Sequence, residues 1–515
     1  MGGAFGARED LNLHIHVCLL ALHTGRPVKM VYGRAESFTG HVHRHPAWMW
    51  FRHHATTDGR LVRVEARVLL DGGAYASTTP AVLANACFFA VGPYRVDSVK
   101  VDGVGVRTNN PPCGAMRGFG AVQACFGYES QMDRLAAELG IDPLELRRRN
   151  ALETGDVFPT TGQPITTPLP TREVIDTLAA LPLPADETPS DPRRLPGGTG
   201  LTTPARAVRR GVGYALGIKN LGYSEGFDDY AEAEVELTPE GAVVYTAAVE
   251  VGQGLVTVLG QIARTALGVS RVEVRLADTS RIGSAGSTSA SRQTQISGGA
   301  VAEAARQLRD EILADFDGDD LDDRGVWRGG ELVADLAEVA SRKEYRRRVT
   351  FRHPPTEAPD EDGQGTVHAD FAVAGHRAVV DVDPELGLVR VVRVDTAQDV
   401  GRVLNPVSVR GQIEGGIAQG VGLAVMEELI LDRGVIRNAG FTDYLLPTAL
   451  DAPEVEAALI ESEGSWGPFG AKGVGEPPTI SSTAAVAAAI RAATGVDITR
   501  VPVRPQDIVG IEEDP

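Results

Sequence analysis

Alternating hydrophobic and polar positions recur along the chain and predict short strands. Residues 231–237 alternate Ala, Val and Leu with Glu, as expected for a strand that exposes one face. Two hairpins are predicted where turn residues separate two alternating runs. One hairpin covers residues 48–70 with its turn at 57–60, and the other covers residues 379–394 with its turn at 384–387. The same pattern predicts further strands at residues 28–32 and 243–249.

Hydrophobic residues at helical spacing predict helices between these strands. One helix is expected over residues 143–150, because Pro143 is a favoured first residue of a helix. Another is expected over residues 482–494, which are rich in Ala and end at Gly495. Further helices are predicted at residues 11–22, 131–139, 172–181 and 301–316. Interleaved helices and strands of this kind indicate an α+β fold.

A composition shift divides the chain into two large parts. Residues 159–210 are rich in Pro, Thr and Gly, which is typical of a connection between domains. We therefore expect a first domain over residues 1–158, a connecting segment over 159–210 and a second domain over 211–515. The acidic run at residues 315–323 is interpreted as a solvated loop, with metal binding as the remote alternative.

Composition and charge exclude several classes of protein. A net charge of −19 disfavours a nucleic-acid surface, because phosphate binding needs clustered Lys and Arg. The four cysteines form no Cys-x-x-Cys pair, so neither an iron–sulfur site nor a zinc ribbon is expected in this chain. No signal segment and no uncharged apolar run of about 18 residues is found, so we expect a cytoplasmic protein that does not cross a membrane.

Glycine-rich segments carry the candidate chemistry. The chain contains 59 glycines, and five segments combine them with small or amide residues: 2–9, 113–123, 250–257, 286–301 and 411–422. Such loops can place backbone N–H groups around a polar ligand. A dinucleotide-binding loop is disfavoured, because the Gly252-Gln253-Gly254 run lacks the third glycine of that fingerprint.

Glu476 is the candidate general base. It follows Gly473 and Gly475, and it precedes Pro477 and Pro478, which restrict where its carboxylate can point. This arrangement suits proton transfer at a bulky ligand. The alternative interpretation is a surface turn with an incidental Glu.

Together, these segments resemble the signature loops of the molybdenum subunit in the xanthine dehydrogenase and aldehyde oxidase family. The matching stretches are, in order, GGAFGARE (2–9), AMRGFG (115–120), VGQG (251–254), GQIEG (411–415) and KGVGEP (472–477). The resemblance covers nearly the whole chain and is most like bacterial xanthine dehydrogenase at residues 2–10 and 109–123. It implies two large mixed α/β domains with a molybdenum cofactor between them.

The resemblance also implies which residues contact the cofactor, a molybdopterin in its cytosine dinucleotide form. The implied contact residues are Phe5, Gly6, Arg117, Gly252, Gln253, Ala290, Ser291, Gln412 and Gly475. A pterin and a pyrophosphate need many backbone donors, which glycine-rich loops can supply. No side chain of the protein is expected to ligate the metal.

Four further roles follow from the resemblance. Glu476 is the implied base for the attacking oxygen, which comes from water. Glu9 and Phe119 are implied to orient and stack on a planar substrate, with a helix-start charge and core packing as the respective alternatives. Asn85 lies where purine-oxidising members often carry an arginine. Because an amide brings no positive charge, Asn85 leaves purine specificity open.

The predicted function is therefore oxidation of xanthine or hypoxanthine by a molybdenum hydroxylase subunit of purine catabolism. The alternatives are an aldehyde or nicotinate-like N-heterocycle dehydrogenase on the same cofactor, or a non-catalytic remnant. Fe–S and FAD groups are expected on partner subunits or domains of a hetero-oligomer. Because the family's subunit extends upstream of residue 2, we expect the first domain to be N-terminally incomplete. Gly118 stands where the carbon monoxide dehydrogenase branch has a cysteine, which disfavours that branch.

Histidines offer one competing interpretation. His41, His43 and His45 alternate along a segment expected to be extended, and three histidines on one face can bind zinc. We regard this as the weaker hypothesis, since the expected reaction needs no metal ligand from the protein.

Overall fold

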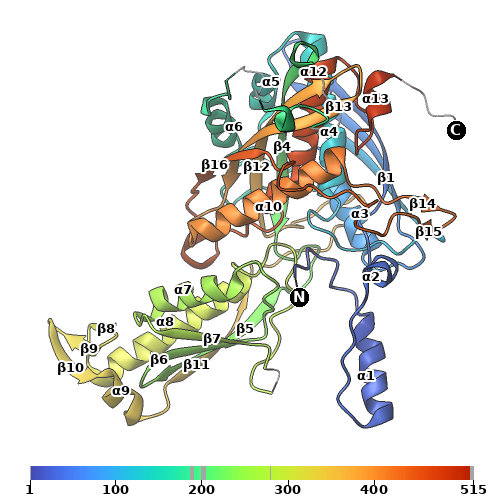
Figure 1. Cartoon of the computed structure of the whole chain (residues 1–515). Helices are drawn as coiled ribbons and strands as arrows, with labels where there is room; N and C mark the ends of the chain where they lie inside the picture. Colours follow the sequence, from blue (N-terminus) through green and yellow to red (C-terminus); the bar gives the residue numbers. More distant parts are fainter. Residues whose placement is uncertain (1, 186–190, 199–203, 279, 511–515) are drawn as a thin grey trace.

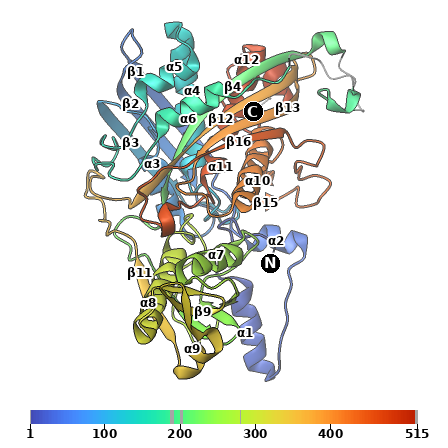
Figure 2. The ribbon, with the colours of Figure 1, turned by 90° about the vertical axis from the view of Figure 1, so that its left-hand side faces the viewer.

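The computed structural model describes residues 2–185, 191–198, 204–278 and 280–510. It consists of two lobes, one above the other in Figure 1, with the N-terminus between them. The smaller, lower lobe contains residues 230–352, and the larger lobe contains residues from both sides of that segment. Figure 2 shows the same separation after a 90° turn. The predicted α+β fold class is confirmed, because helices and mixed sheets occur in both lobes.

The described residues that precede residue 222 form six helices and four strands, which belong to the larger lobe except for α1 (Leu13–Thr24), which extends beside the smaller lobe in Figures 1 and 2. They are α1 (Leu13–Thr24), α2 (Arg34–Gly40), β1 (Ala47–Ala55), β2 (Leu61–Asp71), α3 (Thr79–Phe88), β3 (Ser98–Val106), α4 (Ala121–Leu139), α5 (Pro143–Asn150), α6 (Thr171–Ala180) and β4 (Arg209–Leu221). Short 3₁₀ turns occur at Pro192–Arg194 and Ala205–Ala207.

The smaller lobe and the returning part of the larger lobe follow in the sequence. The smaller lobe contains β5 (Tyr230–Thr238), β6 (Gly241–Thr246), α7 (Leu255–Leu267), β7 (Val272–Leu276), α8 (Ile296–Phe316), β8 (Asp320–Asp322), β9 (Gly325–Arg328), β10 (Glu331–Asp335), α9 (Leu336–Arg342) and β11 (Arg346–Arg352). The returning part contains β12 (Asp370–Asp383), β13 (Leu388–Asp399), α10 (Pro406–Val425), β14 (Leu431–Asp432), β15 (Val435–Ile436), β16 (Glu454–Ile460), a 3₁₀ turn (Pro468–Gly470), α11 (Pro477–Ile480), α12 (Ser482–Thr494) and α13 (Pro505–Val509).

Two sheets and a central helix build the larger lobe. One sheet has the order β16-β13-β12-β4, with β13 and β16 parallel and the other pairs antiparallel. The other sheet has the order β1-β2-β3. Helix α4 contacts β1 on one side and both β4 and α12 on the other, so it lies between the two sheets. Sequence-distant segments therefore share one hydrophobic core, which runs from Leu61 to Ile508.

Helix α12 packs unusually closely on β4. A Cβ built on Gly213 would lie 2.1 Å from the backbone nitrogen of Ala489, and one on Gly211 would lie 2.1 Å from the Ala489 carbonyl oxygen. Only glycine therefore allows the helix to approach this strand. Because α12 begins six residues after Glu476, this contact fixes the helix that follows the candidate base.

The smaller lobe has its own core. Helices α7 and α8 pack on each other, and α8 also packs against β5 and β11 of the β11-β5-β6-β7 sheet. The buried members of the second hydrophobic core lie between Ala231 and Tyr345, and Leu404, Trp466 and Phe469 of the larger lobe pack against it. Packing thus groups residues 230–352 apart from the rest, and the division into 1–158, 159–210 and 211–515 stays a prediction.

Most predicted elements are found, including both hairpins, but two predictions are wrong. Residues 28–32 were expected to form a strand, yet they connect α1 to α2 and pair with no strand among the described residues. Alternation alone does not supply a neighbouring strand. Residues 315–323 were expected to be a solvated loop, yet they end α8 and form β8, where Asp322 accepts a 2.8 Å hydrogen bond from the indole of Trp327.

No helix in the described ranges is long and apolar enough to cross a membrane.

The contact between β4 and α12 predicts a large cost for one added methyl group. Gly213→Ala forces its Cβ into the backbone of Ala489, so we expect a loss of about 1–3 kcal/mol of unfolding free energy. The matched control is Gly411→Ala, because a Cβ on Gly411 meets no atom within 4 Å and alanine favours the helix. Equal urea midpoints for the two variants would contradict this packing.

Candidate functional site

A cavity of about 940 Å³ lies between the two lobes, and its walls come from every glycine-rich segment predicted for the site. The larger lobe contributes the N-terminal loop, residues 115–119 and residues 400–415, and the smaller lobe contributes residues 251–258 and 287–294. All predicted site residues line it: Phe5, Gly6, Glu9, Asn85, Arg117, Phe119, Gly252, Gln253, Ala290, Ser291, Gln412, Gly475 and Glu476. Segments from opposite ends of the sequence therefore meet at one place.

Strained backbone concentrates at this cavity. Ten non-glycine residues in the described ranges have a positive φ, and half of them line the cavity. These five have φ between 47° and 63°: Phe5, Phe119, Glu225, Ala290 and Ser291. Such conformations cost about 1–3 kcal/mol each and persist where the surrounding structure enforces them. Their clustering indicates a site built for a ligand.

Glu476 faces the cavity from the N-cap of α11 and is 8% exposed. Its Oε1 accepts a 3.2 Å hydrogen bond from the N–H of Gly118, and its Oε2 accepts a 3.0 Å hydrogen bond from the hydroxyl of Ser291. Donors from both lobes therefore orient the carboxylate. The alternative of an incidental Glu on a surface turn is wrong, because this side chain is buried and held.

Arg117 joins four of the cavity loops. Its guanidinium donates to the carbonyl of Gln412 at 2.9 Å, to the carbonyl of Gly475 and to the side chain of Gln419 at 3.2 Å. Its backbone N–H donates to the carbonyl of Phe5 at 2.7 Å. Burial lowers the pKa of Arg117 to about 10, and the negative charge of Glu476 opposes that shift. Because its partners are mostly neutral, the guanidinium keeps its positive charge available to the cavity.

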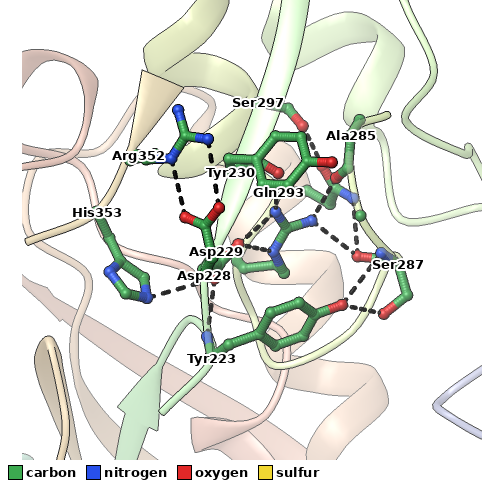
Figure 3. Close-up of polar contacts among 12 residues, drawn as sticks. Tyr223, Asp228, Asp229, Tyr230, Ala285, Ser287, Gln293, Ser297, Arg352 and His353 are labelled. Atoms are coloured by element: carbon green, nitrogen blue, oxygen red, sulfur yellow. Dashed lines mark hydrogen bonds and ion pairs between the residues drawn. The ribbon is translucent and has the colours of Figure 1, made fainter. Parts of the chain in front are cut away.

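The loop that carries Ala290 and Ser291 is anchored by a fully buried ion pair. Arg292 donates from Nε to Asp229 at 2.7 Å, and its other nitrogens donate to the carbonyls of Tyr230 and Ser287 at 2.8 and 3.0 Å. Figure 3 shows this network, with Tyr223 hydrogen-bonded to Ser287. The network holds residues 285–292 against β5, so the strained residues of the loop keep their position.

The loop before Glu476 is held by a second buried ion pair. Lys472 Nζ lies 2.6 Å from the carboxylate of Asp399 and 2.6 Å from the carbonyl of Pro168, and neither side chain of the ion pair is exposed. Burial raises the pKa of Asp399, and Lys472 opposes the shift. The pair ties the loop to the end of β13, which fixes where the chain enters Glu476.

Asn85 and Lys219 form a polar pair in the same cavity. Asn85 is on α3 and Lys219 is near the end of β4, and both are almost fully buried. The ammonium of Lys219 donates to Asn85 Oδ1 at 3.1 Å and lies 4.0 Å from Glu476 Oε1. Burial lowers the pKa of Lys219, and Glu476 opposes the shift. The ammonium of Lys219 therefore places a positive charge next to Asn85, the position at which an arginine was considered in the sequence analysis.

Lys219 was missed by the sequence-based prediction. A signal was available, because Lys219 is a charged residue in a strand whose last seven positions are buried, and a buried lysine needs a functional or structural reason. Arg44 was missed as well. It donates at 2.8 Å to the carbonyl of Arg117, and burial lowers its pKa to about 10.

Glu9 and Phe119 both line the cavity, and their roles stay predictions. Burial raises the pKa of Glu9, a hydrogen bond with Ser289 opposes that shift, and the negative charges of Glu476 and Asp10 add to it. The ring of Phe119 also packs against a small core cluster around Val82, so packing and substrate stacking are compatible for this residue.

The three alternating histidines have separate partners. His41 hydrogen-bonds to Ser37, His43 to the carbonyl of Phe38, and His45 to Thr79. In the part of the chain that the structure describes, no group of three or more His, Cys, Asp and Glu side chains could hold a metal ion.

Comparison with known proteins identifies the family. Models described as a molybdopterin cofactor-binding domain match residues 1–151 and 201–453. A probable xanthine dehydrogenase subunit from Bacillus subtilis is 30% identical over 99% of this chain and 68% of its own length. The chain belongs to the xanthine dehydrogenase family. It is a molybdenum-cofactor-binding subunit of that family, and the predicted resemblance is confirmed.

Two further matches in this family define how far the likeness reaches. The aldehyde oxidoreductase structure from Desulfovibrio desulfuricans superposes with a TM-score of 0.84 at 26% identity over 99% of this chain, which spans about half (54%) of that protein. The nicotinate dehydrogenase large molybdopterin subunit of Eubacterium barkeri is 48% identical over 30% of this chain and 36% of its own length.

The cavity fits a molybdopterin cofactor. A volume near 940 Å³ is at the upper end for small-molecule and cofactor sites, as a bulky ligand requires. Cβ atoms built on Gly252 and Gly411 would meet no protein atom within 4 Å, although both residues line the cavity. Side chains at these positions would extend into the space that the cofactor needs. Gln253 hydrogen-bonds to Val251 and Val249 and so stabilises its own loop.

The Lys472–Asp399 pair generates a stability prediction. Lys472→Met leaves the carboxylate of Asp399 buried without its partner, so we expect a loss of about 3–5 kcal/mol of unfolding free energy. The double variant Lys472→Met/Asp399→Leu removes both charges and should recover most of that loss. Urea unfolding of the wild type, Lys472→Met, Asp399→Leu and the double variant measures it, and a double loss equal to the sum of the single losses would contradict the coupling.

The raised pKa of Glu9 generates a pH prediction. In the native chain, Glu9 keeps its proton to a higher pH than in the unfolded chain, where the ordinary value is 4.5. The native state therefore binds more protons above pH 4.5, and stability falls as pH rises through the folded pKa. Relative to Glu9→Gln, the wild-type unfolding free energy should decline from pH 4 to pH 8. A parallel pH series for both proteins would contradict this, and Glu463→Gln, on an exposed loop, is the control.

Proposed function

We propose that the chain is the hydroxylating subunit of an oxidoreductase that converts hypoxanthine or xanthine to the hydroxylated purine during purine catabolism. The observation that supports this most is the buried carboxylate of Glu476, which faces the cavity shared by Phe5, Arg117 and Gln253. Membership of the xanthine dehydrogenase family supports the reaction class.

Each lobe has a part in holding the cofactor, which we propose to be in its cytosine dinucleotide form. From the larger lobe, the cofactor would be held by the N-terminal loop, Arg117, Gln412 and Gly475. From the smaller lobe, it would be held by Gly252, Gln253, Ala290 and Ser291. When bound, the cofactor supplies the centre that accepts an electron pair from the substrate. The overall reaction is R–H plus water giving R–OH, two electrons and two protons.

Glu476 would take the proton from the attacking oxygen, which derives from water. Its carboxylate is suited to this because the donors Gly118 and Ser291 hold both of its oxygens at 3.0–3.2 Å and set its direction. Glu9 and Asn85 would orient the substrate through hydrogen bonds, and Phe119 would stack on its ring. Burial of Glu476 and Asn85 would keep water from these two groups and strengthen their electrostatic interactions.

A second candidate substrate class is a nicotinate-like N-heterocycle. Two observations favour it: the local likeness to a nicotinate dehydrogenase subunit, and the ammonium of Lys219, which can attract a carboxylate. An aldehyde is a third candidate, supported by the fold shared with an aldehyde oxidoreductase.

We further propose that electrons leave through Fe–S and FAD groups on partner subunits of a hetero-oligomer. The absence of a Cys-x-x-Cys pair in this sequence and the subunit names of its relatives support that arrangement. A cytoplasmic location stays a prediction.

The first test produces the chain together with the proposed Fe–S and FAD partner subunits. It measures the molybdenum content of the complex and its rate of substrate turnover. We expect molybdenum bound to the wild type and to Glu476→Gln in equal amounts. We expect kcat/KM to fall about 10²–10⁴-fold in Glu476→Gln, the contribution typical of a positioned general base. Glu463→Gln is the matched control, because this glutamate lies on an exposed loop. Absence of molybdenum from the wild type would overturn the proposal in favour of a non-catalytic remnant.

A further inference from the structure

The environment of Lys219 carries an inference that rests on the proposed function and goes beyond it. Its ammonium has three donors and no acceptor. Two of the donors are engaged, with Asn85 Oδ1 at 3.1 Å and with the side-chain oxygen of Asn220. For the third, the nearest described anion is Glu476 Oε1 at 4.0 Å. A fully buried lysine that is only partly neutralised stands at the reacting end of the cavity.

Lys219 also determines how the amide of Asn85 is turned. An ammonium can only donate, so the Asn85 atom that it contacts must be the carbonyl oxygen. The NH₂ group of Asn85 is then on the other side of the amide, where no described residue accepts from it. This nitrogen is not among the buried polar atoms that lack a partner, so it keeps accessible surface, and Asn85 lines the cavity. A ligand can therefore reach two N–H donors.

We propose that Lys219 is a positioning and specificity-determining residue. It holds the amide of Asn85 with its NH₂ toward the substrate, and it places a positive charge 4.0 Å from the carboxylate of Glu476. The site thereby selects substrates with a hydrogen-bond acceptor, a ring nitrogen or carbonyl oxygen, away from the carbon that is hydroxylated.

The charges around the pair support this assignment. Glu476 interacts electrostatically with three cations and one carboxyl group: Lys219, Arg117, Arg44 and Glu9. Lys219 also interacts with the carboxyl group of Glu225. His368 lies near Lys219 but stays neutral, because burial lowers its pKa to about 3. At 4.0 Å, Lys219 forms the ion-pair contact that the structure records for Glu476. Lys219→Met removes this positive charge from its contact with the carboxylate of Glu476.

The first experiment measures the pH dependence of kcat/KM in the loaded enzyme. In Lys219→Met the acidic limb should move to higher pH by roughly 1 unit, as expected for the loss of one opposite charge. Lys219→Arg should restore the limb, because it restores the charge. Lys100→Met, which removes an exposed lysine, is the control and should match the wild type. An unmoved limb in Lys219→Met would overturn the role toward Glu476.

The second experiment uses two substrates that differ only in a ring nitrogen, pyridine-3-carboxaldehyde and benzaldehyde. Lys219→Met and Asn85→Leu should each raise KM for the pyridine about tenfold, which corresponds to one hydrogen bond of about 1.4 kcal/mol, and leave KM for benzaldehyde unchanged. The double variant should be no worse than Asn85→Leu, since Lys219 acts through Asn85. Equal effects on both aldehydes would overturn the role toward Asn85.

The third experiment separates this inference from the proposed function, because it needs no turnover. Unfolding midpoints of the cofactor-free chain are measured for Lys219→Met, Glu476→Gln and the double variant. The double variant should lose less than the sum of the single losses, because the two charges interact. Additive losses would overturn the pairing even in an active enzyme. An inactive wild type with non-additive losses would instead overturn the proposed function and leave the pairing supported.

Discussion

Buried cations that bridge distant loops are the interaction on which the rest of this structure depends. Arg117, Arg292 and Lys472 each hold a cavity-lining loop to a segment far away in the sequence, through backbone carbonyls or one carboxylate. Glycine-rich loops have little side-chain surface to bury, so hydrophobic packing alone cannot hold them in position. Charged side chains take over that task, and their desolvation is offset by several hydrogen bonds each.

This arrangement also explains where the backbone strain is found. Residues such as Ala290 and Ser291 adopt positive φ in a loop whose ends are fixed by the Arg292–Asp229 pair. The surrounding network offsets the free-energy cost of these strained conformations, and the strained residues line the cavity. A site for a large polar cofactor can thus form from short, loosely packed segments, provided that their anchors are rigid.

The sequence predicted which residues line the cavity better than it predicted which of their side chains contact one another. The glycine-rich segments and Glu476 could be recognised because short motifs mark them, and the structure brings all of them together. Lys219 carried no motif, and its importance appears only when β4 and α3 bring it to Asn85. The strand expected at residues 28–32 shows the same limit, since its alternation was correct but tertiary structure supplied no partner. Contacts between distant segments, which periodicity does not encode, decided these cases.

The close approach of α12 to β4 has a consequence for how such a protein can diversify. Strand β4 carries the glycines that seat the helix and, further along, Lys219, while the helix follows shortly after Glu476. This glycine-dependent contact therefore fixes the position of the proposed base, Glu476, relative to Lys219. Asn85 approaches from a different helix and is not part of that contact. If the proposed roles hold, exchange of residues on α3 can change the substrate preference without disturbing the packing that positions Glu476 and Lys219.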